Sequence, residues 1–421
     1  MNFTHKSWPF GLSGPCERQP LPVVYAKATI TTNLTLSPQA RRDDSGPPDL
    51  GWHYDGLDYV FGGCDFYANL TLTNGVTLAW YEDYGSAGGD YGQPYGLTLN
   101  DGAIFTSSGT VPQPNWITRF NTVQETVNGQ WGQRGWMAGI LINAGTNAPP
   151  QINAQFTKWS CPAGVTGYFR DDWAAGVVRL FSCEFYGVGV ADYYPNLYFT
   201  NCLLFRAGLS LGYEVVATPS VTFDNCTFYG GALLLCRQGD APAWWTLENN
   251  TFDGTAFVTL DNWDGDTNYT AMDHNAYNTG NTEWQTYDAG VGQASAGTLE
   301  TVGPTDALVT DGYGWQSSWP GNFYLPPDSP LIQAGSTTAD QLGLYEYTTQ
   351  TNQIKQGSNP VDIGYHFVNF SCEDSWTYQY QNFTGAWISF HTCTSTCVYN
   401  CTNFQAYVTY CGDAGTNQGP Y

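Results

Sequence analysis

The sequence predicts an all-β protein, a right-handed parallel β-helix followed by a small disulfide-rich C-terminal extension. Three observations predict this class. A short unit repeats in the middle of the chain, charged residues make up only 12% of 421 residues, and aromatic residues reach 16%. Helices usually need more Lys, Arg and Glu than this for their solvated faces, so the composition favours strands.

The repeat places like residues at intervals of 19, 24, 24 and 25, aligned on Cys183, Cys202, Cys226, Asn250 and Asn275. Apolar residues stand three positions before and two positions after each of these points, and five positions before all of them except Asn275, where Thr270 stands. Val178, Leu180 and Phe185 occupy these positions in the first unit. This alternation indicates a strand, a tight polar corner and a second strand. One such unit cannot bury its own apolar face, so the units must stack.

Stacked units lie about 4.8 Å apart, which brings like side chains into files. We expect Asn201, Asn225 and Asn249 to form an amide ladder that exchanges hydrogen bonds along the corner, where Asn tolerates a left-handed backbone. The three repeat cysteines should form a buried file of thiols. Directly paired parallel strands give poor disulfide geometry, so at most one bridge is expected there.

The same template recurs around Cys64, with Tyr59, Phe61, Gly63 and Phe66 in register. Looser matches at residues 97–105 and 137–143 fill the interval, and residues 81–95 read as a loop. We therefore assign residues 55–367 to the β-helix, residues 1–54 to an N-terminal extension and cap, and residues 368–421 to a Cys-rich tail.

A second repeat joins the two ends of the predicted β-helix. Residues 49–54 (DLGWHY) return as residues 362–367 (DIGYHF). A structural corner explains the motif, with Asp capping a turn, Gly at positive φ and the aromatic residues packed in the core. A ligand role for the Asp–His pair is the weaker alternative, because the two copies lie a whole β-helix apart.

Several segments resemble uncharacterised secreted β-helix proteins of environmental bacteria. They are PPDLGWHYDGLDYVFGG near the start, DHNAY at residues 273–277, residues 322–355 and the closing DIGYHF. The last two are also similar to the terminators of bacterial surface β-helices. The resemblance covers about residues 38–367. It implies an exported, often modular protein with a β-helix architecture, and it carries no known active site.

Charge and cysteine usage restrict the partners and the compartment. Acidic residues outnumber basic ones 37 to 13, so the formal charge of −24 would repel a nucleic acid backbone. No run of 18 apolar residues suggests insertion into a membrane. Twelve cysteines against three methionines favour an oxidising, extracellular or cell-surface location. The first residues lack a secretory apolar segment, so we expect either that the numbering begins after processing or, less favoured, a cytosolic chain.

Candidate modification sites follow from sequons and from the crowded cysteines of the tail. Glycosylation candidates are Asn2, Asn33, Asn69, Asn225, Asn249, Asn268, Asn369, Asn382 and Asn400. Disulfide candidates are Cys372, Cys393, Cys397, Cys401 and Cys411. The spacing of Cys393, Cys397 and Cys401 could instead hold a metal, but zinc sites usually use tighter pairs of cysteines.

Two acidic segments could carry chemistry. Asp171 and Asp172 are weak candidates for a catalytic carboxylate pair, and two adjacent carboxylates on a turn are the favoured explanation. Asp261, Asp264, Asp266 and Asn268 resemble the first half of a calcium loop, although no bidentate Glu follows. Calcium is therefore a possible ligand, and no other cofactor is expected.

Two classes of function remain open. The first is an extracellular structural or adhesive β-helix whose main partner is itself, assembling into a fibre or surface layer, since solenoid ends expose unpaired strand edges. The second is a β-helix that binds glycans or degrades polysaccharides as a lyase or glycoside hydrolase. The sequence leans towards the first class and against an enzyme.

Overall fold

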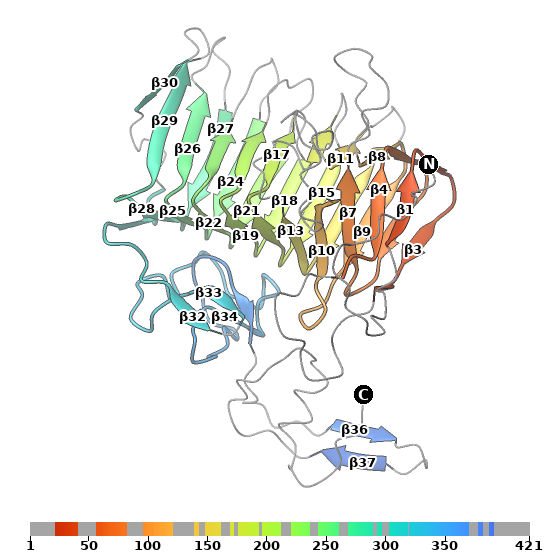
Figure 1. Ribbon diagram of the computed structural model, residues 1–421. Helices are drawn as coiled ribbons and strands as arrows, with labels where there is room; N and C mark the ends of the chain where they lie inside the picture. The colour runs from red at the N-terminus through yellow and green to blue at the C-terminus, as the bar shows by residue number, and fades with distance from the viewer. Residues whose placement is uncertain are drawn as a thin grey trace, which may run out of the picture.

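A computed structural model shows an all-β chain of long parallel sheets stacked in register, consistent with a parallel β-helix (Figure 1). The structure describes residues 22–40, 56–81, 96–120, 139–142, 148–160, 169–171, 176–192, 196–211, 220–235, 243–260, 268–288, 293–296, 303–318, 320–369, 378–381 and 387–390. Within those ranges, no helix is long and apolar enough to cross a membrane.

Sheet A is the longest, with eleven strands in the described part of the chain. Its strands are, in spatial order, β1 (Val23–Ala26), β4 (Tyr59–Gly62), β7 (Thr77–Tyr81), β10 (Asn115–Arg119), β13 (Thr157–Ser160), β16 (Glu184–Tyr186), β19 (Leu203–Phe205), β22 (Thr227–Tyr229), β25 (Thr251–Asp253), β28 (Ala276–Asn278) and β31 (Ala307–Val309). All neighbours within it are parallel.

Sheet C forms a second parallel face. Its strands are β3 (Leu34–Leu36), β6 (Leu70–Leu72), β9 (Ile104–Ser108), β12 (Gln151–Gln155), β15 (Val177–Phe181), β18 (Asn196–Thr200), β21 (Ser220–Asp224), β24 (Ala243–Glu248) and β27 (Asn268–Asp273). Each turn of the chain adds one strand to sheet A and one to sheet C. We call one such turn a rung, and we call the rungs from β1 to β31 the stack.

Sheets B and D supply the third strand of successive rungs, and β14 of sheet B lies next to β17 of sheet D. Sheet B consists of β2 (Thr29–Ile30), β5 (Cys64–Phe66), β8 (Leu97–Leu99), β11 (Ile140–Ile142) and β14 (Phe169–Asp171). Sheet D consists of β17 (Gly189–Asp192), β20 (Gly208–Leu211), β23 (Ala232–Leu235), β26 (Ala256–Leu260), β29 (Glu283–Asp288) and β30 (Gln293–Ala296), the last being antiparallel to β29.

The interior of the stack is a continuous apolar core. Rings of successive rungs stack face to face, as Phe228 and Phe252 do at 4.8 Å between ring centroids and Phe252 and Tyr277 at 5.1 Å. The alternation of buried and outward residues along each strand of sheet C is the period-2 pattern that predicted strands. The expected strands within residues 97–105 and 137–143 are present as β8, β9 and β11.

The first rung comes from residues 23–36, whose strands pair in parallel with β4, β5 and β6. The sequence had placed these residues in the N-terminal extension, ahead of residue 55. Their own burial is incomplete, since Val23 and Val24 are largely exposed. The weaker apolar pattern of an end rung explains why it was not recognised.

The alignment of Cys64 with the central repeat was wrong. Cys64 opens β5, so it lies at the corner between sheets A and B. Cys183 instead lies between β15 and β16, at the corner between sheets C and A. Both corners follow a strand and contain a left-handed residue, Gly63 at φ 63° and Ser182 at φ 50°. Their local patterns are therefore alike although their positions in the rung differ.

Residues 320–369, which we call the strap, lie along the flank of the stack (Figure 1). The strap contains β33 (Gly321–Tyr324), which pairs with β32 (Gln316–Ser318), and the antiparallel pair β34 (Tyr347–Thr348) and β35 (Phe367–Val368). Its aromatic residues Tyr324, Tyr365 and Phe367 pack on Leu203 of β19. The strap thus covers the outer face of sheet A around β19 and β22.

The remaining described residues form one antiparallel pair, β36 (Tyr378–Gln381) and β37 (Trp387–Phe390). They belong to the tail for which the sequence predicts disulfides. The five candidate cysteines, Cys372, Cys393, Cys397, Cys401 and Cys411, lie outside the described residues.

Candidate functional site

The corner between sheets C and A is a regular file of left-handed residues. Ser182, Asn201, Asn225, Asn249 and His274 have φ between 50° and 59°. Asn accepts this conformation at low cost because its short polar side chain can hydrogen-bond locally. The predicted position and backbone of the asparagine file are therefore confirmed.

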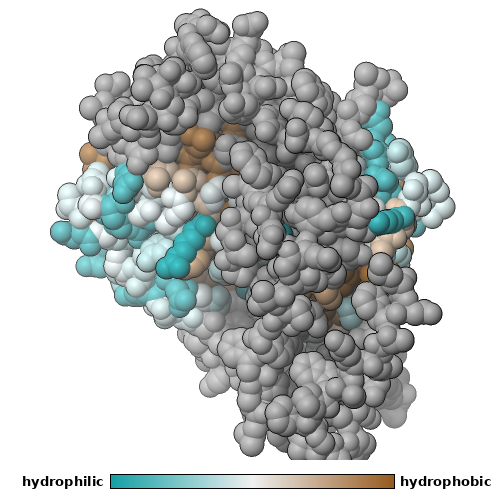
Figure 2. All heavy atoms as spheres, turned by 45° about the horizontal axis from the view of Figure 1, so that its top comes forward, coloured by the Kyte–Doolittle hydropathy of each residue, from teal (hydrophilic) through white to brown (hydrophobic). Residues whose placement is uncertain are grey.

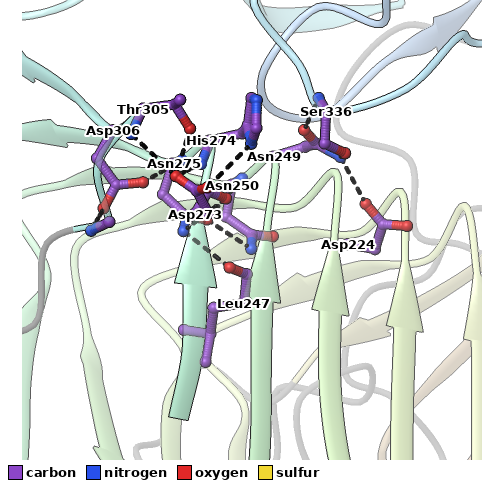
Figure 3. Close-up of polar contacts among 11 residues, drawn as sticks. Asp224, Leu247, Asn249, Asn250, Asp273, His274, Asn275, Thr305, Asp306 and Ser336 are labelled. Atoms are coloured by element: carbon purple, nitrogen blue, oxygen red, sulfur yellow. Dashed lines mark hydrogen bonds and ion pairs between the residues drawn. The ribbon is translucent and has the colours of Figure 1, made fainter.

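The predicted hydrogen bonding of this file was wrong, because the three asparagines bind the strap. Asn201 accepts the backbone N–H of His366 at 2.7 Å and donates to the His366 carbonyl at 3.0 Å. Asn225 donates to the Asp362 carbonyl at 3.0 Å. Asn249 accepts the backbone N–H of Ser336 at 2.8 Å (Figure 3). The strap backbone offers acceptors to Asn201 and Asn225 and donors to Asn201 and Asn249.

An amide file does run along the stack, but one position further into the core. Asn250 accepts the backbone N–H of Cys226 at 2.9 Å, and Asn275 accepts that of Asn250 at 3.0 Å. Asp306 closes the file by accepting the backbone N–H of Asn275 at 2.7 Å. The sequence alignment found these two asparagines but missed Asp306, because it lies 31 residues beyond Asn275 and outside the regular spacing.

The buried cysteines of this file carry free thiols, in agreement with the expected thiol file. Cys183 and Cys202 donate to the carbonyls of Ala154 and Leu180, both at 3.6 Å. Burial raises the pKa of both thiols well above the ordinary value. A protonated, buried thiol is a poor nucleophile, so these residues act as small core side chains.

The DIGYHF motif of the strap forms the structural corner that the sequence predicted. Asp362 accepts hydrogen bonds from the Gln333 backbone and the Gln356 side chain, both at 2.7 Å, and also from the Thr349 hydroxyl. Gly364 has φ of 106°, and a Cβ there would meet the Thr251 side chain at 3.0 Å. The first copy, at residues 49–54, lies outside the described residues.

His366 is the unusual member of the motif. It is fully buried between strap and corner, and neither ring nitrogen has a hydrogen-bond partner within the described part of the protein. Burial lowers the pKa of His366 to about 4, although the nearby Asp362 carboxylate acts in the opposite direction. The imidazole is therefore neutral when the strap is in place at neutral pH.

Carboxylates line the end of sheet C beside this corner. Asp224, Glu248 and Asp273 are in register on three successive strands. Burial raises the pKa of Asp224 to about 6, despite a hydrogen bond from Asn249 at 3.1 Å (Figure 3). Burial also acts to raise the pKa of Asp273, but hydrogen bonds from Thr305 prevail and lower it. Among the described residues, no group of three or more His, Cys, Asp or Glu could hold a metal ion.

Most of the predicted catalytic and calcium-binding residues lie outside the part of the chain that the structure describes. Asp171 ends β14 with its side chain undescribed, and Asp172 is outside. Asn268 opens β27, likewise without a described side chain. The other calcium candidates, Asp261, Asp264 and Asp266, are outside the described residues.

The glycosylation candidates differ in exposure. Asn33 is exposed, and Asn69 and Asn369 are half-buried. Asn225 and Asn249 are fully buried beneath the strap, so a sugar on either amide would require the strap to separate from the corner. The candidates whose side chains lie outside the description are Asn2, Asn268, Asn382 and Asn400.

Comparison with known protein families, with curated proteins and with solved structures finds no match for this chain.

Proposed function

We propose that this protein is an extracellular structural or adhesive β-helix of right-handed winding that assembles end to end with copies of itself. Right-handed winding is the near-universal hand of connections between parallel strands. The observation that carries the assembly is the exposure of apolar residues on both terminal strands of sheet A.

At the C-terminal end, Leu308 of β31 is in register with Tyr277 of β28, which belongs to the interior file. Tyr277 is fully buried, whereas Leu308 is 55% exposed. At the other end, Val23 and Val24 of β1 are 44% and 54% exposed. Brown, hydrophobic residues are visible among teal and white ones at the left of Figure 2.

The two ends complement each other as strand edges. β1 and β31 are the outermost strands of one parallel sheet, so the edge of one copy can continue the ladder of the next. Such a contact joins different surfaces and propagates without closing, which produces a filament. The net charge of −24 keeps neighbouring filaments apart. A glycan on the exposed Asn33 and disulfides in the tail would suit an extracellular setting.

Substitutions at the two ends test the proposal. Leu308→Lys and Val24→Lys place a charge in the proposed contact, and each should abolish filaments in electron microscopy and leave monomers in sedimentation velocity. The matched control is Ile354→Lys, on the strap, where the wild-type side chain is 50% exposed and apolar. Wild-type chain that stays monomeric at high concentration, or end variants that assemble like the control, would contradict end-to-end assembly.

Asp224 and Glu248 favour a second candidate, a glycan-binding or polysaccharide-degrading protein. Adjacent parallel strands are about 4.8 Å apart, close to the roughly 5–5.5 Å between the carboxyl groups of retaining glycosidases. A carboxyl group with a pKa of about 6 has the character of a general acid. A screen of acidic and neutral polysaccharides supports this candidate only if Asp224→Asn removes the turnover found with the wild type.

A further inference from the structure

The contact between strap and corner encloses an ionisable group in a site built for its neutral form. His366 is fully buried, and its ring nitrogens have no acceptor or donor within the described part of the chain. The Asn201 side chain accepts a hydrogen bond from the His366 backbone N–H at 2.7 Å and donates one to the His366 carbonyl at 3.0 Å. A charged group placed in such surroundings loses hydration without gaining a partner.

We propose that the strap is a pH-operated latch, closed over the corner while His366 is neutral and released when its imidazole is protonated. Protonation would turn both ring nitrogens into donors with no acceptor in the closed site, so the strap must lift for water to reach them. The rungs beneath need not move, because their ladders are formed within the stack. Release uncovers the amides of Asn201, Asn225 and Asn249.

The charged and titratable neighbours fix the direction of the response. Asp362 is the carboxylate that favours a charged imidazole, but its oxygens are already held by Gln333, Gln356 and Thr349. The other titratable groups around the adjacent Tyr365 are Tyr347 on the strap and Glu184, Tyr186 and Cys202 on the stack. Burial raises the pKa of these phenols and of the thiol, which therefore stay neutral on acidification.

The sign of the effect follows from linkage. A released His366 takes up its proton near pH 6.5, whereas the closed site lowers that pKa to about 4. The stability contributed by the neutral site is therefore complete above pH 6.5 and is lost as pH falls towards 4. Asp224, at the same corner, titrates in the opposite sense, since burial raises its pKa to about 6 and protonation favours the closed state.

Hydrogen exchange read by mass spectrometry tests the latch on the full chain carrying Asp224→Asn, which removes the opposing titration of Asp224. In this chain, after correction for intrinsic exchange rates, peptides from residues 337–368 should lose protection on the order of 30-fold between pH 7.5 and pH 5. Peptides from β18 to β25 should keep their protection. His366→Leu removes the titrating group, so its strap should stay equally protected at both values of pH.

The control is His274→Asn in the same Asp224→Asn chain, which removes a histidine from the left-handed file without touching the buried site and should leave the response unchanged. A strap in the Asp224→Asn chain whose protection does not change with pH, or one that still opens when His366→Leu is added, would overturn the proposal. If His366→Leu does not fold, an NMR titration of wild-type His366 decides. A pKa near 6.5 refutes the latch, and one near 4 supports it.

Discussion

Single residues of the corner show how position in a rung decides the role of a side chain. Asn249 and Asn250 are adjacent in sequence, yet Asn249 binds the strap at Ser336 and Asn250 binds along the stack at Cys226. The left-handed backbone at Asn249, with φ of 59°, turns the two side chains in different directions. The same turn leaves Asp224 partly buried next to the Asn249 amide, where its ionisation costs free energy.

Asp224→Asn should therefore stabilise the protein at neutral pH. The folded pKa of Asp224 is about 6 against an ordinary 3.8, so the native state binds more protons between these values and loses stability as pH rises through them. We expect a gain of about 1–2 kcal/mol in the free energy of unfolding at pH 7.5 and little change at pH 3.5. Urea unfolding at both values checks this. An equal change at both would show that the buried charge is not the cause.

At the scale of elements, the strap approaches the stack closely at Gly364. The Cα of Gly364 faces the Thr251 side chain of β25. The next residue, Tyr365, donates its backbone N–H to the Thr227 hydroxyl at 2.9 Å. The positive φ of Gly364 and the short space above Thr251 both require glycine. A side chain at position 364 would therefore interfere directly with docking.

Gly364→Ala should weaken strap docking by about 2–3 kcal/mol, since it combines backbone strain with a contact against Thr251. The matched control is Gly343→Ala, which also has a positive φ, of 74°, but has open space around its Cβ and should cost only about 1 kcal/mol. Limited proteolysis within residues 337–360 reports docking. Equal protease resistance in the two variants would refute the role given to the close approach.

Much of the stack could be predicted, because stacking imposes a regular spacing on local sequence. The files through Cys183, Cys202 and Cys226 lie where the alignment placed them. The strap could not be found in this way, since Asn201 meets His366 across 165 residues and no period links them. The corner at Cys64 was misplaced because local alternation does not say which of the three corners of a rung it describes.

For the candidate site, the sequence identified the residue types of the corner but not their partners. The sequence indicates Asn225 and Asn249 as sequons and as members of a ladder. In the structure both are buried under the strap and hydrogen-bond to its backbone. The sequence places His366 in a motif typical of a structural corner. The structure shows that Asn201 bonds to its backbone and that its ring is enclosed without a hydrogen-bond partner among the described residues. Burial of this kind is a tertiary property.

For the whole molecule, charge and end contacts act against each other. A formal charge of −24 makes copies repel, while exposed Leu308 and Val24 favour apolar contact at the ends. The repulsion is long-ranged and is screened over about 8–10 Å at physiological salt, whereas the apolar contact is not weakened by salt. The balance between monomer and filament should therefore depend on ionic strength.

Raising NaCl from about 20 to 500 mM should lengthen the filaments and lower the concentration at which they form. Light scattering and sedimentation at fixed pH measure this. The monomeric variant Leu308→Lys serves as the control and should remain dispersed at both concentrations. Dissolution of wild-type filaments by salt would mean that attraction between opposite charges, and not apolar contact, joins the ends.

The course of the strap determines where the rest of the chain departs. Residue 369 bonds to Glu346, beside the pair Tyr347 and Phe181, so the polypeptide leaves the flank near β15 and not the end at β31. The described strap thus ends on the flank of the stack. With eleven strands spaced at about 4.8 Å, each copy in the proposed fibre would add about 50 Å of length. The points where the chain continues past residue 369 would then recur along the fibre at that interval, a pattern suited to holding other molecules at fixed distances.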